Sequence, residues 1–177
     1  IETALAVEVY VQNDVTAAAG GESMFGAAKS LDNYLFFYLG ARLHHRLVLN
    51  HQILQSPNQT SSPIGLIELE SRLQGKGLPS EELWIRGGQW PDFGDVRQIW
   101  INDCLAVLSN AVGSASQFLP VKTVIISSYA PKRVCDEIAS ALADMQPRIE
   151  VKVGGLAISP KALGAASLPF SSKFTVS

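Results

Sequence analysis

A run of large apolar residues, Tyr34–Leu39, constrains the fold more than any other feature of this chain. A strand with one solvent-exposed face alternates apolar and polar side chains, and this run does not alternate. Asn33 stands before the run, and Gly40 interrupts the pattern directly after it. The pattern therefore predicts a strand, Asn33–Leu39, that lies inside a sheet and is covered on both faces.

The rest of the chain alternates between strand-like and helix-like segments. Further strands are predicted at Val7–Gln12, Leu47–Leu49, Ile64–Leu69, Thr123–Ile126 and Ile149–Val153. Helices are predicted at Val15–Ala28, Asp95–Phe118, Pro131–Asp144 and Pro160–Ala166. Between them we expect a turn at Asn50–Gln52 leading into Ile53–Leu54, a polar loop at Gln55–Pro63, and a short helical piece with turns within Leu78–Gly94. Strands that alternate with helices late in the chain imply parallel crossovers, and the earlier run of three strands implies a meander. The order predicts a single α/β domain with a mixed sheet flanked by helices.

The composition fits one such domain and limits its partners. Of the 177 residues, 47% are hydrophobic and 17% are charged, so the chain can bury a sizeable core and is not expected to be disordered. The net charge of -2, without any block of Lys and Arg, predicts that these residues do not themselves bind DNA. No apolar run approaches the roughly 20 residues that span a bilayer, so we expect no membrane partner.

Cysteine usage and the chain start bear on location. Cys104 and Cys135 lie far apart in helix-like segments, which favours two reduced, partly buried thiols in a cytoplasmic protein, with a single disulfide as the alternative. No signal-peptide pattern is visible. Ile1–Ala6 is typical of the last turns of a helix already under way, so we expect the chain to be a fragment of a longer protein.

Three segments carry a resemblance to a known family. An Asn-Asp pair, Asn13-Asp14, separates a strand-like stretch from an alanine-rich one that reaches Glu22 and Gly26. The apolar hairpin pattern Tyr34–Leu54 and the closing stretch Ala162–Phe170 follow. Together they resemble the ROK family of sugar kinases and sugar-responsive repressors, and the closing stretch is similar to the NagC/XylR-type regulators. The resemblance implies a ribonuclease H-like lobe of the actin-like sugar kinase fold, with residues 1–177 as its single C-terminal lobe.

The same resemblance implies a site at the Asn-Asp pair. In the kinases of the family the Asp is the catalytic base and the Asn binds the sugar, so Asp14 is the candidate catalytic residue, and Asn13 and Asp14 are the candidate sugar-binding residues. A carboxylate at the carboxyl end of a strand is well placed for such a role. The alternative is that one of the two residues only caps the following helix.

The departures from the family pattern concern phosphate and sugar binding. The glycine-rich phosphate turn of the kinases corresponds to Gly40–Arg46, in which one glycine survives and Arg42 and Arg46 offer only point charges. The family's Gly-Glu-x-Gly-His motif corresponds to Ser62–Leu66, which contains neither Glu nor His. A later glycine pair corresponds to Ser127-Ser128. We therefore expect no nucleotide cofactor and doubt any catalysis by Asp14.

Histidines and tryptophans suggest further roles that we weigh against ordinary packing. His44 and His45 point to opposite faces of a strand, so they cannot ligate one ion with His51 without distortion, and the zinc cysteines of many family members are absent. We predict no metal site. Trp100 is expected in the core or in a dimer interface, where it would form an apolar stripe with Val96 and Ile99.

The leading interpretation is the sugar-effector-sensing and dimerisation domain of a ROK-type transcriptional regulator. It implies a small-molecule sugar as ligand, a homodimer, and DNA contact only through a helix-turn-helix outside this chain. The first alternative is an ATP-dependent ROK sugar kinase acting on a hexose or N-acetylhexosamine. The second is a lobe that binds no ligand and serves as an oligomerisation scaffold.

Overall fold

The computed structural model describes residues 14–54, 61–85, 88–155 and 175–176. Its helices are α2 (Asp14–Phe25), α3 (Leu66–Gly75), α4 (Gly94–Phe118) and α5 (Lys132–Met145), with a 3-10 helix η1 (Glu81–Trp84). Its strands are β1 (Tyr34–Leu39), β2 (Leu43–Leu49), β3 (Gln52–Leu54), β4 (Thr123–Ser128), β5 (Glu150–Val153) and β6 (Thr175–Val176). The predicted strand Val7–Gln12 and helix Pro160–Ala166 lie outside the described residues.

The strands form one mixed sheet in the order β5-β4-β1-β2-β3-β6. β1 runs parallel to β4 and antiparallel to β2, and β4 runs parallel to β5. Parallel neighbours need a crossover connection, and here α3 and α4 precede β4 while α5 joins β4 to β5. The predicted α/β class with a mixed sheet is confirmed.

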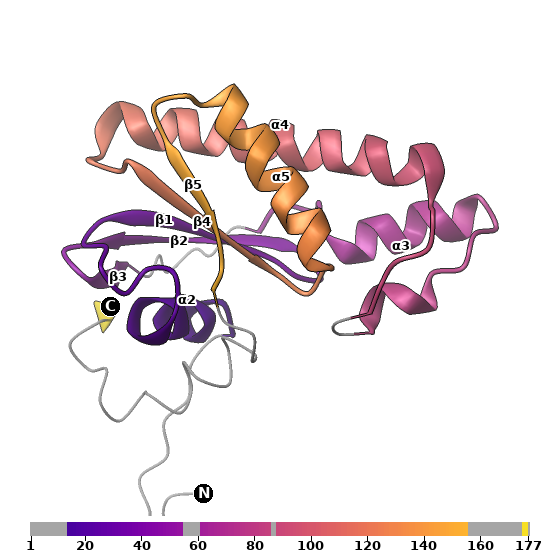
Figure 1. The fold of residues 1–177 in the computed structure, drawn as a ribbon, viewed down its shortest axis with the longest axis horizontal. Coiled ribbons are helices and arrows are strands. Elements are labelled where there is room, and N and C mark those ends of the chain that lie inside the picture. Colours follow the sequence, from indigo (N-terminus) through magenta and orange to yellow (C-terminus); the bar gives the residue numbers. More distant parts are fainter. Residues whose placement is uncertain (1–13, 55–60, 86–87, 156–174, 177) are drawn as a thin grey trace, which may run out of the picture.

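The sheet is sandwiched between helices, with β1 at its centre (Figure 1). Leu35, Phe37 and Leu39 pack into the core beneath α3, α4 and α5. The alternate residues of β1, such as Phe36, pack with α2 on the opposite face. All of β1 is buried, so the absence of alternation in its sequence reflects two covered faces, as predicted.

A two-residue turn closes the hairpin of β2 and β3. Asn50 and His51 have φ angles of 50° and 64°, the left-handed pair that matches the twist of hairpin strands. The Asn33 side-chain oxygen accepts a hydrogen bond from the Asn50 amide at 2.9 Å. The turn therefore lies where the sequence predicts it.

The predicted strand at Ile64–Leu69 is wrong. Ser62, just before this range, forms an isolated β-bridge with Leu43, and α3 begins at Leu66. The buried residues Leu66, Leu69 and Leu73 lie on one face of this helix. The third strand of the meander is β3.

Trp100 belongs to the core and not to an exposed stripe on α4. Its side chain is fully buried and packs edge-to-face against Trp90, with ring centroids 6.0 Å apart. The predicted stripe therefore lacks Trp100, its largest member, whereas Ile99 is 54% exposed and stays on the surface. Cys104 and Cys135 are free and buried, in line with the two reduced thiols that the sequence favours. In the described ranges no helix has the length and apolar character that a bilayer crossing requires.

Candidate functional site

The carboxyl ends of the parallel strands β1, β4 and β5 converge at one edge of the sheet, where ligands of α/β proteins collect. Four segments meet there and are called the strand-end site. They are the β1–β2 turn at 40–42, the loop 62–66, the end of β4 at 127–128, and the residues 154–155 after β5.

The β1–β2 turn is bound to the start of α3. Leu66 and Ile67 donate backbone hydrogen bonds to the carbonyls of Gly40 and Ala41, at 2.9 and 3.2 Å. Because α3 has no side-chain cap, these carbonyls satisfy amides that a helix start leaves free. A Cβ at Gly65 would lie 2.4 Å from the Ala41 carbonyl oxygen, so this approach requires glycine. Two carbonyls of the turn are therefore occupied by hydrogen bonds from α3.

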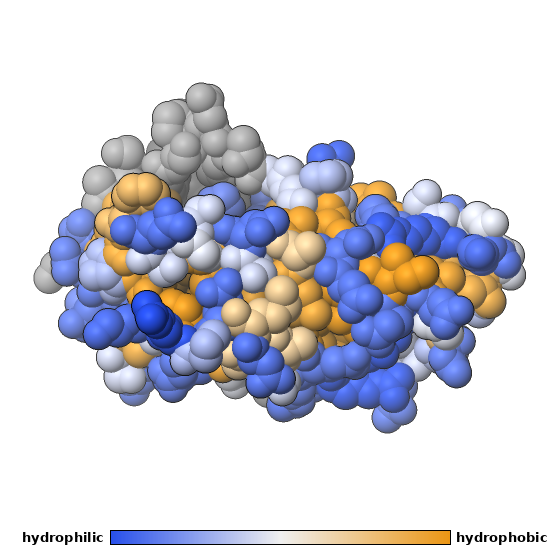
Figure 2. Space-filling view, turned by 90° about the horizontal axis from the view of Figure 1, so that it is seen from above, coloured by the Kyte–Doolittle hydropathy of each residue, from blue (hydrophilic) through white to orange (hydrophobic). Residues whose placement is uncertain are grey.

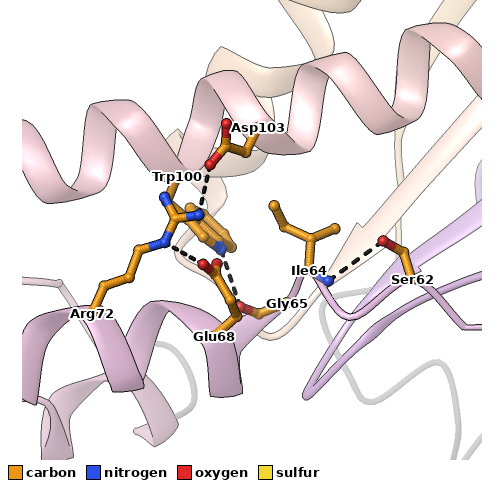
Figure 3. Close-up of polar contacts among 7 residues, drawn as sticks. All are labelled: Ser62, Ile64, Gly65, Glu68, Arg72, Trp100 and Asp103. Carbon is orange, nitrogen blue, oxygen red and sulfur yellow. Dashed lines mark hydrogen bonds and ion pairs between the residues drawn. The ribbon is translucent and has the colours of Figure 1, made fainter.

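The loop 62–66 is fixed from the other side by α4 (Figure 3). The indole Nε1–H of Trp100 donates to the Gly65 carbonyl at 3.0 Å, and the Ser62 hydroxyl accepts from the Ile64 amide at 3.4 Å. Glu68, two residues beyond the loop, is paired with Arg72, which also contacts Asp103. The loop thus contributes backbone and one hydroxyl to the site, and the carboxylate that follows it is neutralised.

The two serines at the end of β4 fill space at the site. The Ser128 hydroxyl donates to the Leu39 carbonyl at 2.6 Å and accepts from the Ala130 amide at 2.9 Å, so it fastens β4 to β1. Ser127 is buried, and its hydroxyl oxygen would lie 3.1 Å from a Cβ at Gly154. The side chains of both serines therefore occupy the end of β4.

Glu22 connects α2 to the end of β5. Its buried carboxylate accepts hydrogen bonds through Oε2 from the Ala27 amide at 2.8 Å and the Gly155 amide at 3.1 Å. Oε1 is buried and has no hydrogen-bond partner among the described residues. The sequence singles out Glu22 only within the family resemblance. Its positioning role was missed because the contact joins residues 133 positions apart.

The start of α2 is anchored to β2 by an arginine. Arg46 is 5% exposed and donates from Nε to the Thr16 hydroxyl at 2.8 Å and from Nη1 to the His45 carbonyl at 2.7 Å. Desolvation lowers the pKa of the Arg46 guanidinium. Arg46 thus faces inward, whereas Arg42 is exposed on the turn. Asp14 is the first residue of α2.

The other residues singled out in the sequence are the Asn-Asp pair and the histidines. Asn13 and the side chain of Asp14 lie outside the described part of the structure. His45 lies beside Phe37, with ring centroids 6.4 Å apart, and His51 pairs with Asp32 at 2.9 Å on the surface. Within the described residues, no group of three His, Cys, Asp or Glu side chains gathers in a metal-binding arrangement.

Comparisons with known proteins identify the fold. No protein-family model and no curated protein match the sequence. Among solved structures, a ROK hexokinase from Thermus thermophilus is 17% identical with a TM-score of 0.68, over 96% of this chain and 68% of that chain. A putative N-acetylmannosamine kinase from Listeria monocytogenes is 12% identical with a TM-score of 0.72, over 97% of this chain and 69% of that chain.

A regulator has the same fold as these kinases. A ROK family transcriptional regulator, a homologue of the E. coli MLC protein, is 15% identical with a TM-score of 0.58. The match covers 93% of this chain and 52% of the regulator. At such identities the likeness establishes the fold. The chain therefore has the mixed α/β, ribonuclease H-like fold that ROK sugar kinases share with a ROK transcriptional regulator.

Proposed function

We propose that this chain is the sugar-sensing and dimerisation lobe of a ROK-type transcriptional regulator that acts in the cytoplasm. The observation that carries the proposal is the state of the strand-end site, where the β1–β2 turn is committed to α3 and Ser127-Ser128 fill the end of β4. A kinase must hold phosphates against backbone amides and position them for transfer. At this edge of the sheet, the Gly40 and Ala41 carbonyls are bonded to α3, and the Ser128 hydroxyl is bonded to the Leu39 carbonyl and the Ala130 amide.

Sugar recognition needs less than phosphate transfer. Hydroxyl groups can be bound by one or two carboxylate or amide side chains, and Asn13 and Asp14 provide both kinds where α2 begins. Glu22 and Arg46 hold the two ends of α2 against β5 and β2. A sugar that favours one arrangement of this lobe and the rest of the protein would shift a closure equilibrium and so change DNA affinity through a helix-turn-helix outside the chain.

In this proposal the protein is a homodimer that associates through the surface of α3 and α4. Figure 2 looks onto the side of the sheet that α4 and α5 cover and shows hydrophobic residues among hydrophilic ones. Ile67 on α3 and Ile99 on α4 are 52% and 54% exposed. A hollow of about 300 Å³ beside Val96 and Ile99 can accept an apolar side chain of a second copy.

Calorimetric titration of the full-length protein with common hexoses and their N-acetyl forms tests sugar sensing. Loss of one contact in Asn13→Ala or Asp14→Ala should cost on the order of 1–3 kcal/mol, or roughly 5- to 150-fold in affinity. Asp136→Ala is the matched control, because it removes a carboxylate that pairs with Lys132 on the surface of α5. Its affinity should be unchanged.

Two results would contradict the proposal. Absence of binding by every sugar removes the sensing role and leaves an oligomerisation scaffold. Unchanged affinity in both variants, with a lower melting temperature, assigns the Asn-Asp pair to helix capping. The alternative of a sugar kinase rests on the kinases among the structural neighbours, and turnover assays separate it from sensing.

A further inference from the structure

Another hollow lies at the opposite edge of the sheet from the strand-end site. It has a volume of about 650 Å³ and lies where α4 and α5 end and where β4 and β5 begin. We call it the helix-end hollow. Its apolar wall residues are Leu119, Pro120, Val121 and Ile149. Because ligands of α/β proteins collect at the carboxyl ends of the strands, this hollow is separate from the proposed sugar site.

The charged part of the helix-end hollow is basic. Lys122 and Arg148 line it and are exposed, and neither forms an ion pair with a described residue. Among the described residues that line the hollow, none carries a carboxylate. Glu150, which follows in β5, is paired with Lys152, and Asp144 does not line the hollow. Apolar walls beside two such cations favour an occupant that has large apolar side chains and carboxylates.

The residues 81–85, called the η1 segment, present the matching chemistry on the surface of the same chain. Glu81 and Glu82 are exposed, and neither forms an ion pair within the described part of the chain. Trp84 and Ile85 are 41% and 58% exposed, although both are large and apolar. The indole Nε1–H of Trp84 donates to a glutamate of α3 at 3.0 Å, so the ring is already oriented. A segment held in place in this way loses little conformational freedom on binding.

The helix-end hollow and the η1 segment cannot meet within one chain. The η1 segment is bonded to α3, which lies at one end of the long axis, whereas α4 ends at the other (Figure 1). Arg72 of α3 contacts Asp103, which precedes Phe118 by fifteen residues of helix, or about 22 Å. Phe118 itself is 84% exposed beside the wall residue Leu119. The two matching surfaces can therefore meet only between copies.

We infer that the helix-end hollow binds the η1 segment of a second copy of this chain. The two apolar residues of the segment lie against the apolar walls, and its two glutamates face the two cations. Because the contact joins two different surfaces, it is heterologous and can link more than two copies. It does not rest on the proposed function.

The contact is expected to be weak. One short segment buries a small area, and exposed ion pairs add little to affinity, so we expect a dissociation constant on the order of 0.1 mM. At micromolar concentrations the contact is largely open, and the proposed α3–α4 surface sets the number of associated copies.

Exchanging the charges of the two surfaces tests the inference in the full-length protein. One variant carries Lys122→Glu with Arg148→Glu, and the other carries Glu81→Lys with Glu82→Lys. Each variant alone has like charges on both surfaces, so sedimentation velocity at about 0.3 mM should show association weakened by roughly 10-fold or more. A mixture of the two restores opposite charges at every contact. Its affinity should recover to within about 3-fold of that of the unaltered protein.

The matched control carries Lys29→Glu with Lys132→Glu, which makes the same change of charge at exposed lysines outside both surfaces. Its effect should stay below about 2-fold. Ile99→Glu leaves both surfaces intact, so association at high concentration should persist there, which separates this contact from the proposed α3–α4 dimer. Absence of association in the unaltered protein, equal losses in the control, or a mixture that fails to recover would each overturn the inference.

Discussion

Replacing Gly65 by alanine tests the close contact between the loop 62–66 and the β1–β2 turn. The new Cβ would lie 2.4 Å from the Ala41 carbonyl oxygen and 2.6 Å from the Arg42 Cα, and both atoms belong to the backbone. Ordinary contacts of a Cβ are 3.4–4 Å, so the turn and α3 must move apart. That movement weakens the hydrogen bonds that the Leu66 and Ile67 amides donate to the turn. Overpacking and weakened hydrogen bonds together should lower the free energy of unfolding by about 2–5 kcal/mol.

The matched control is Gly75→Ala, at the last residue of the same helix. A Cβ there meets nothing within 4 Å, so the change should be neutral or stabilise the fold by up to about 1 kcal/mol through helix propensity. Urea unfolding followed by far-ultraviolet circular dichroism measures both variants. A difference of less than about 1 kcal/mol between them would refute the close approach of turn and loop.

Three further predictions concern the core and the α3–α4 surface. Trp100→Phe should lower the free energy of unfolding by about 2–4 kcal/mol in urea titrations, because the Gly65 carbonyl loses its hydrogen-bond donor and a gap opens beside Trp90. Burial raises the pKa of Cys104 to about 12 and of Cys135 to about 11, so iodoacetamide at pH 8.5 should alkylate both at least about 100-fold more slowly in the folded than in the unfolded chain. Because these pKa values are raised, the thiols favour the folded state below about pH 8.5, and that contribution is lost as the pH rises toward 11 and 12. Light scattering should give twice the 19.0 kDa mass of the chain, and Ile99→Glu should yield monomers.

Each of these predictions has its own control and its own contradiction. Trp84→Phe makes the same change at an indole that is 41% exposed and bonded to Glu70, and it should cost less than about 1 kcal/mol. Equal losses at the two tryptophans would contradict the buried role of Trp100. Rapid alkylation of the folded chain would show that the thiols are accessible. Gln98→Glu adds the same charge at an exposed neighbour of Ile99, and loss of the dimer there too would locate the interface elsewhere.

The sequence predicts the parts of the fold in which local pattern and tertiary packing agree. The uninterrupted apolar run of β1 reflects two covered faces, and the start of α5 after Pro131 is explicit in its residues. Helix α3 was missed because the short window Ile64–Leu69 hides a helical spacing that becomes visible only when Leu73 is included.

The errors near the site have a different origin, because they depend on contacts between distant segments. β2 begins at Leu43, but the polar residues His44–Arg46 conceal its start. Thr16 on another element is one of the acceptors that make the burial of Arg46 possible. The link between Glu22 and Gly155 and the capping of α3 by the β1–β2 turn likewise join residues far apart in the chain. No local pattern encodes them.

Release of ADP by the full-length protein, with Mg-ATP and a panel of hexoses and N-acetylhexosamines, tests the central claim most directly. In the proposed sensing lobe, Ser127 and Ser128 fill the strand-end site and the β1–β2 turn is hydrogen-bonded to α3. We therefore expect no ADP release that depends on sugar. Sugar-dependent ADP release that disappears in Asp14→Asn would contradict the account and establish a sugar kinase.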